Sequence, residues 1–223
     1  MAPPHCPMPS IEAPTKSPLI NVYCLNAACS NQICHMALNI VSTHECNFDF
    51  VLLQEPWYGS ITSTNDIQGT VSMQGWQPIM PLSSILEDHH PRVMAYVCME
   101  ARLEVVSCTD IIDDLDIQVL DIKCQGVSQP IMWLVNIYNK SAVEEEEGFS
   151  VNCLCETVFD DNMATILTGD WNLCHLICCK MDGNRDQQVN DTVLWLHEND
   201  FRLHNPGWSA NYQYLTRYNE PCI

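Results

Sequence analysis

Positive charge is scarce in this sequence. Nine Lys and Arg residues stand against 28 Asp and Glu residues, which gives a formal net charge of −19. The nine bases are scattered and form no basic run. Because neutralisation of phosphates by Lys and Arg supplies most non-specific affinity for DNA, this composition argues against a broad nucleic-acid surface.

Long apolar segments are also missing. Residues 1–18 hold six of the 13 prolines and no apolar core of a secretion signal, and no run of 18 apolar residues follows. We expect residues 1–18 to be a disordered tail and residues 19–223 to form a folded domain, since 47% hydrophobic content is enough for a core. We also expect an intracellular protein, nuclear or cytoplasmic, without a membrane partner.

Cysteine, in contrast, is abundant, with 14 residues. Without a secretion signal, reduced thiols are expected. The tightest group is Cys174, His175, Cys178 and Cys179, but no second cysteine pair stands at a zinc-site spacing. We therefore interpret these cysteines as small apolar residues rather than zinc ligands.

The hydrophobic pattern predicts an α+β sandwich, with two packed sheets and helices outside, rather than a pure βαβ order. Strands are expected at residues 19–26, 48–57, 75–82, 93–99, 115–123, 131–139 and 164–172. Helices are expected at 30–45, 144–160 and 189–200, the second of which begins with the acidic run 144–147. The continuous apolar run at 48–57 is typical of a strand buried on both faces.

Polar residues stand where several of these strands end. They are Asn26, Glu55, Tyr138, Asp170 and Asn172. If the strand ends converge, the carboxylates offer hard oxygen ligands that suit Mg²⁺ or Mn²⁺, and such an ion usually acts on phosphate esters. Each residue also has a simpler interpretation.

The simpler interpretations are local. Asn26 can cap the following helix, Glu55 can be a solvated strand end, and Tyr138 can be a core tyrosine with its hydroxyl at the rim. Gly-Asp in "LTGDWN" is common in turns. The order of all the segments together is harder to obtain by chance.

That order resembles the endonuclease/exonuclease/phosphatase superfamily over about residues 19–215. The segments are "CLN" (24–26), "LLQEPW" (52–57), "VNIYN" (135–139) and "LTGDWN" (167–172). Within it, "QEPW", "PRVMAYV" (91–97) and "GDWNLCH" (169–175) are similar to the endonuclease domain of non-LTR (LINE-type) retrotransposons. Such domains are normally joined to a reverse transcriptase and nick DNA.

The resemblance implies a four-layer α/β sandwich and a role for each residue. Glu55 would bind Mg²⁺ (or Mn²⁺), with Asn26 supporting the metal site. Tyr138 would contact the scissile phosphate, and Asn172 would hold it. Asp170 would orient or activate the attacking water beside the metal. His175 is common in the retrotransposon group.

One motif of the family is missing. No Ser-Asp-His triplet follows Asp170, and His197 and His204 do not fit its position. We therefore expect a domain that lacks its last strands and is weak or inactive on DNA. The alternatives are a phosphatase acting on small phosphorylated molecules or lipids, which suits the acidic charge, and a non-catalytic remnant or interaction domain.

Overall fold

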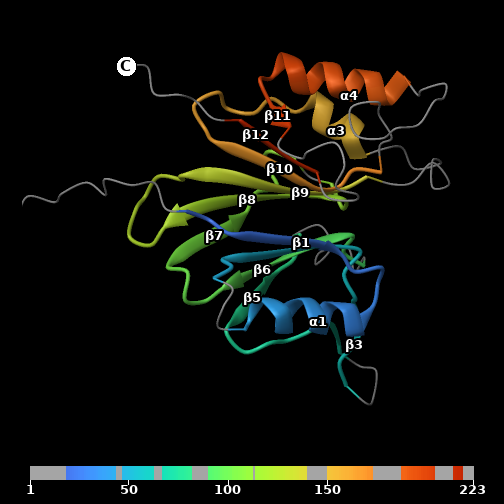
Figure 1. Ribbon diagram of the computed structural model, residues 1–223, viewed down its shortest axis with the longest axis vertical. Coiled ribbons are helices and arrows are strands. Elements are labelled where there is room, and N and C mark those ends of the chain that lie inside the picture. The colour runs from blue at the N-terminus through green and yellow to red at the C-terminus, as the bar shows by residue number, and fades with distance from the viewer. Residues whose placement is uncertain are drawn as a thin grey trace, which may run out of the picture.

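Two β-sheets packed face to face, with helices on both outer sides, make up the fold (Figure 1). The computed structural model describes residues 19–43, 47–62, 67–81, 90–112, 114–139, 150–172, 187–203 and 213–217. Helix α1 covers one sheet, and helices α3 and α4 cover the other. The expected α+β sandwich is confirmed.

The first sheet has four strands. In spatial order they are β1 (Val22–Asn26), β2 (Phe50–Gln54), β6 (Val93–Cys98) and β5 (Trp76–Ile79). Strands β1 and β2 are parallel and are joined through α1 (Asn31–Val41), whereas β6 runs antiparallel to both of its neighbours. A separate hairpin of β3 (Gly59–Ser60) and β4 (Gln68–Gly69) follows β2.

The second sheet has six strands. In spatial order they are β11 (Arg202–Leu203), β12 (Gln213–Arg217), β10 (Thr165–Asp170), β9 (Met132–Tyr138), β8 (Ile117–Cys124) and β7 (Leu103–Ser107). Only β9 and β10 are parallel, and α3 (Ser150–Glu156) lies between them in the chain. Helix α4 (Gln187–Glu198) follows β10. Each sheet therefore holds one parallel pair.

Most predicted elements are present, with shorter bounds. Strands β7, β11 and β12 and the β3–β4 hairpin were not predicted. The N-cap of α1 is Ser30, whose Oγ accepts the Ile33 N–H at 3.3 Å, so the interpretation of Asn26 as the cap is wrong. The tail 1–18 and the acidic run 144–147 lie outside the described residues.

Three apolar clusters hold the layers together. Strand β2 is buried along its whole length, as its sequence predicted. Phe50 and Leu52 point into the space between the sheets, while Val51 and Leu53 pack toward α1. A third cluster lies between the second sheet and the helices α3 and α4. Because successive side chains of a strand point to opposite faces, β2 contributes both to the interface between the sheets and to the interface with α1.

A buried amide crosses the space between the sheets. Asn136 on β9 is fully buried, and its Nδ2 donates to the backbone oxygens of Leu53 and Met94, both at 3.1 Å. Its Oδ1 accepts a hydrogen bond from Nε2 of Gln54, which is also fully buried. Because buried polar groups are costly unless they are paired, these bonds favour one relative placement of the sheets.

Two structural observations concern the expected reduced thiols and the expected lack of a membrane span. The eight cysteines within the described ranges are all free thiols. No helix in the described part of the chain is long and apolar enough to cross a bilayer.

Replacing Asn136 with Leu should destabilise the protein. The change removes both hydrogen bonds that Asn136 donates to the first sheet and leaves the Gln54 amide with only the Cys24 thiol as a partner. A buried polar group that loses its partner costs about 1–3 kcal/mol. We expect a loss of about 3 kcal/mol in the free energy of unfolding, measured by urea denaturation. The double variant Gln54→Leu/Asn136→Leu should lose less than the two single variants added together. An Asn136→Leu protein as stable as the wild type would contradict the bridge.

Candidate active site at the converging strand ends

Alternation along the strands brings one residue from each of four strand ends into the space between the sheets. Cys24 and Leu52 face this space, and so do Asn26 and Gln54, two residues further along β1 and β2. On the second sheet the same alternation directs Tyr138 and Asp170 inward, and the two residues are paired in register across β9 and β10. Glu55 follows Gln54 directly. The carboxyl ends of both parallel pairs therefore meet at one place.

Two hydrogen bonds join the sheets at this place. Asn26 Nδ2 donates to Asp170 Oδ2 at 2.9 Å, and the Tyr138 hydroxyl donates to Glu55 Oε1 at 3.1 Å. Asn26, Glu55 and Asp170 are half-buried, while Tyr138 is 5% exposed. Four of the residues singled out in the sequence are thus brought together from four different strand ends.

Asn172 is placed beside them by the turn that follows β10. Its backbone N–H donates to Asp170 Oδ1 at 3.2 Å, and its Nδ2 donates to the backbone oxygen of Asn139 at 2.6 Å. Its φ of 46° is left-handed, a region that Asn tolerates better than most residues. The side chain is exposed next to Asp170, where it can meet a ligand.

The backbone fixes Glu55 independently of its side chain. Its φ is also 46°, its N–H donates to the Arg92 backbone oxygen at 2.8 Å, and its carbonyl accepts the Cys29 N–H at 2.7 Å. A left-handed non-glycine residue is strained, and such strain persists only where neighbouring contacts hold it. These two bonds hold the carboxylate at the end of β2.

Arg92 is a residue of this site that the sequence pattern did not single out. Its guanidinium carbon lies 4.6 Å from the centre of the Tyr138 ring, and its Nε lies 3.7 Å from Asp116 Oδ1. Pairing the predicted strands 48–57 and 93–99 antiparallel would have placed Arg92 opposite Glu55. The structure therefore puts a positive charge beside the tyrosine in a strongly acidic protein.

Tyr138 keeps its proton at physiological pH. Burial raises the pKa of Tyr138 to about 12, and the negative charge of Glu55 acts in the same direction, while a hydrogen bond with Arg92 and its positive charge oppose both. The hydroxyl is therefore a hydrogen-bond donor, which suits contact with a carboxylate or a phosphate oxygen.

The donor set fits a magnesium-type ion held through few protein ligands. Glu55 and Asp170 are hard oxygen ligands, and Mg²⁺ commonly binds through one or two carboxylates while keeping several waters. Within the described residues no group of three His, Cys, Asp or Glu side chains forms a metal cage. Asn26 Oδ1 accepts the Ala28 N–H at 2.8 Å, which directs its Nδ2 toward Asp170. Asn26 is therefore placed to hold Asp170 in position.

His175 and the cysteines Cys174, Cys178 and Cys179 lie outside the described residues. His197, which does not fit the position of the missing family histidine, lies on α4 and is exposed.

The layers, the two parallel pairs and their shared end define the endonuclease/exonuclease/phosphatase fold. By structure the chain is similar to the endonuclease domain of TRAS1, a telomere-specific non-LTR retrotransposon, with a TM-score of 0.63, 15% identity, and coverage of 89% of this chain and 84% of that one. It is also similar to a humanized D. rerio TDP2 carrying 14 mutations, with a TM-score of 0.51, 10% identity, and coverage of 92% and 85%. By sequence alone the chain matches no family model and no curated protein.

Gly169 should be indispensable for the position of Asp170. Its φ is 135°, and a Cβ there would collide with the backbone of Ile137 on β9. Gly169→Ala should therefore lower the free energy of unfolding by about 3 kcal/mol or more. Gly126→Ala is the matched control because Gly126 also has a positive φ, 80°, but faces open space, so it should cost only about 1 kcal/mol. Equal losses in chemical denaturation would show that the contact with β9 is unimportant.

Proposed function

We propose that the chain hydrolyses phosphodiester bonds of DNA with the help of a divalent ion, Mg²⁺ or Mn²⁺. The observation that carries the proposal is the pair of hydrogen bonds that joins the two sheets at the strand ends, Asn26 to Asp170 and Tyr138 to Glu55. They gather two carboxylates, an amide and a protonated phenol in one place. The fold shared with a retrotransposon endonuclease domain agrees with this activity.

The chemistry of each side chain determines its proposed role in hydrolysis. Asp170 accepts a proton from, or orients, the attacking water, and Asn26 holds Asp170 in position. Tyr138 and Asn172 donate hydrogen bonds to phosphate oxygens. Arg92 adds positive charge where negative charge develops in the transition state. A divalent ion at Glu55, when bound, neutralises charge on the phosphate and the leaving oxygen.

The described residues bring no histidine to the acid–base part of this site. No histidine of the described residues hydrogen-bonds to Glu55, Tyr138 or Asp170. Positioned acid–base catalysis contributes about 10²–10⁴-fold, so hydrolysis by these residues should be slow.

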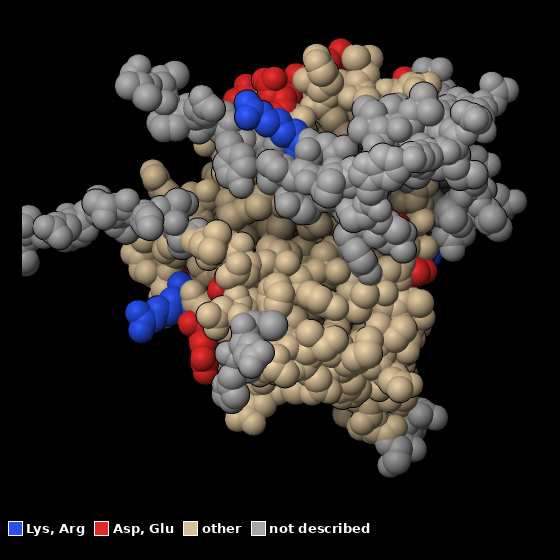
Figure 2. All heavy atoms as spheres, viewed as in Figure 1, with Lys and Arg blue, Asp and Glu red and all other residues tan. Residues whose placement is uncertain are grey.

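Electrostatics also weakens binding to DNA. The net charge is −19, and few Lys and Arg residues appear on the face shown in Figure 2. A protein of this charge repels a nucleic-acid backbone at long range. The same observation favours a second candidate, a phosphatase acting on small phosphorylated molecules or lipids, because such a substrate needs no track of basic residues.

Metal binding should depend on Glu55. Glu55→Gln keeps an acceptor for Tyr138 but loses the charge that attracts Mg²⁺. Calorimetric titration should show at least about tenfold weaker Mg²⁺ or Mn²⁺ binding in this variant. Glu104→Gln, an exposed change on β7, should bind like the wild type. Equal binding by all three proteins would place the ion elsewhere, for example on the acidic run 144–147.

A supercoiled-plasmid nicking assay tests the activity. We expect slow nicking with Mg²⁺, abolished by Asp170→Ala and retained by Glu198→Gln, an exposed change on α4. A parallel assay with a small phosphate monoester distinguishes the phosphatase candidate from the nuclease. A phosphatase would hydrolyse the monoester, and Asp170→Ala would abolish that hydrolysis.

Two other outcomes would overturn parts of this proposal. The absence of any Asp170-dependent hydrolysis would favour a non-catalytic interaction domain. Rapid nicking would show that another group supplies the acid–base chemistry that the described residues lack.

A further inference from the structure

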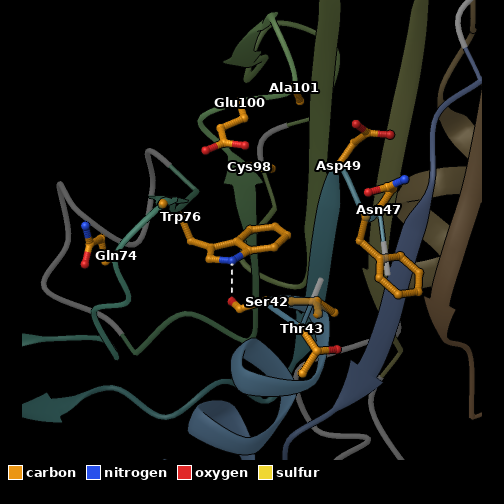
Figure 3. Close-up of a pocket in the computed structure, with 12 residues that line it drawn as sticks. Ser42, Thr43, Asn47, Asp49, Gln74, Trp76, Cys98, Glu100 and Ala101 are labelled. Carbon is orange, nitrogen blue, oxygen red and sulfur yellow. Dashed lines mark hydrogen bonds between the residues drawn. The ribbon is translucent and has the colours of Figure 1, made fainter. Parts of the chain in front are cut away.

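A concave site lies at the other end of the four-stranded sheet from the candidate active site. It is a pocket of about 430 Å³ between the C-terminal end of α1, the residues before β2, the turn before β5 and the turn after β6 (Figure 3). Asp49 in this pocket and Glu55 are six residues apart across β2, which corresponds to roughly 20 Å of extended chain. The pocket is therefore separate from the proposed active site.

An indole ring forms a wall of the pocket. Trp76 is 7% exposed, and its Nε1–H donates to Ser42 Oγ at 2.9 Å. Ser42 Oγ in turn donates to the Leu38 backbone oxygen at 2.6 Å, so the ring is anchored to the last turn of α1. Because the indole N–H already has an acceptor, the ring can offer a ligand only its aromatic surface.

Two carboxylates flank the indole. In Figure 3 the side chains of Asp49 and Glu100 lie on either side of the space above Trp76. Asp49 Oδ2 accepts the Asn21 N–H at 2.8 Å, which fixes that carboxylate, whereas Glu100 is exposed. No Lys or Arg is among the described residues that line the pocket.

The end of helix α1 adds to this negative potential. The pocket includes Val41, Ser42 and Thr43, which lie at the C-terminal end of the helix, where the helix dipole is negative. The pocket therefore combines two carboxylates, a negative helix end and an aromatic wall. Together these features oppose the binding of an anion.

An organic cation fits these groups better than a metal ion does. The pocket provides two carboxylates and is also lined by Cys98, but no group of three His, Cys, Asp or Glu side chains among the described residues is placed to hold a metal ion. An ammonium group has three donors for the carboxylates, and its charge and its aliphatic stem both interact favourably with an indole. The volume lies within the usual range for sites of small ligands.

We propose that this pocket binds an alkylammonium group. The group can belong to a free polyamine or to a lysine side chain of another protein, since both present the same cation on an aliphatic stem. The proposal does not depend on catalysis at Glu55 and Asp170.

Titration calorimetry of the full chain at low salt tests it with two probes, spermidine and N-acetyl-lysine methylamide. We expect saturable binding of at least one probe at a single site, with a shift of the Trp76 indole N–H signal in NMR spectra. Tighter binding of spermidine would point to a free polyamine, and tighter binding of the lysine derivative to a protein partner.

Variants distinguish binding in the pocket from non-specific attraction of a cation to an acidic protein. Glu100→Gln and Asp49→Asn should each weaken binding about fivefold, and Asp49→Asn retains an acceptor for the Asn21 N–H. Glu104→Gln removes the same charge from exposed β7 outside the pocket and should leave binding unchanged. The proposal fails if neither probe binds at millimolar concentration, or if Glu104→Gln weakens binding as much as Glu100→Gln.

Discussion

The hydrogen bonds of Asn136 across the sandwich are the constraint on which the candidate site depends. They tie β9 to the backbones of β2 and β6, in a space that is filled mostly by apolar side chains. Once that placement is set, the two-residue alternation of the strands decides which later side chains also point inward. Tyr138, two residues after Asn136, and Asp170, its partner in register, then reach residues at the ends of β1 and β2.

The interior between the sheets changes from apolar to polar toward the site. Phe50, Leu52 and Leu134 lie in the apolar part, and Gln54 and Asn136 form a fully buried polar layer beyond them. The half-buried carboxylates Glu55 and Asp170 follow at the surface. This gradient positions charged groups without burying them deeply, which avoids the large cost of removing an ion from water.

Much of the site could be anticipated because its residues directly follow strongly apolar strands such as 48–57 and 131–139. Sequence order alone could not show Arg92, because its position over Tyr138 results from the antiparallel pairing of β2 with β6. Strands β3, β4 and β11 have only two residues each, too short for a periodic signal. Two of the five residues of β7 are exposed and none is buried, so its apolar signal is weak, and its pairing with β8 comes from tertiary structure.

The hydrogen bonds of the site join parts of the chain that are far apart in sequence. The separation is 144 residues between Asn26 and Asp170, 83 between Glu55 and Tyr138, and 82 between Gln54 and Asn136. Closing such long loops costs conformational entropy before any contact compensates for it. Neither half of the chain contains the site, so it comes into existence only after both sheets have formed and docked. During folding, the candidate site is therefore assembled late, as a property of the finished sandwich.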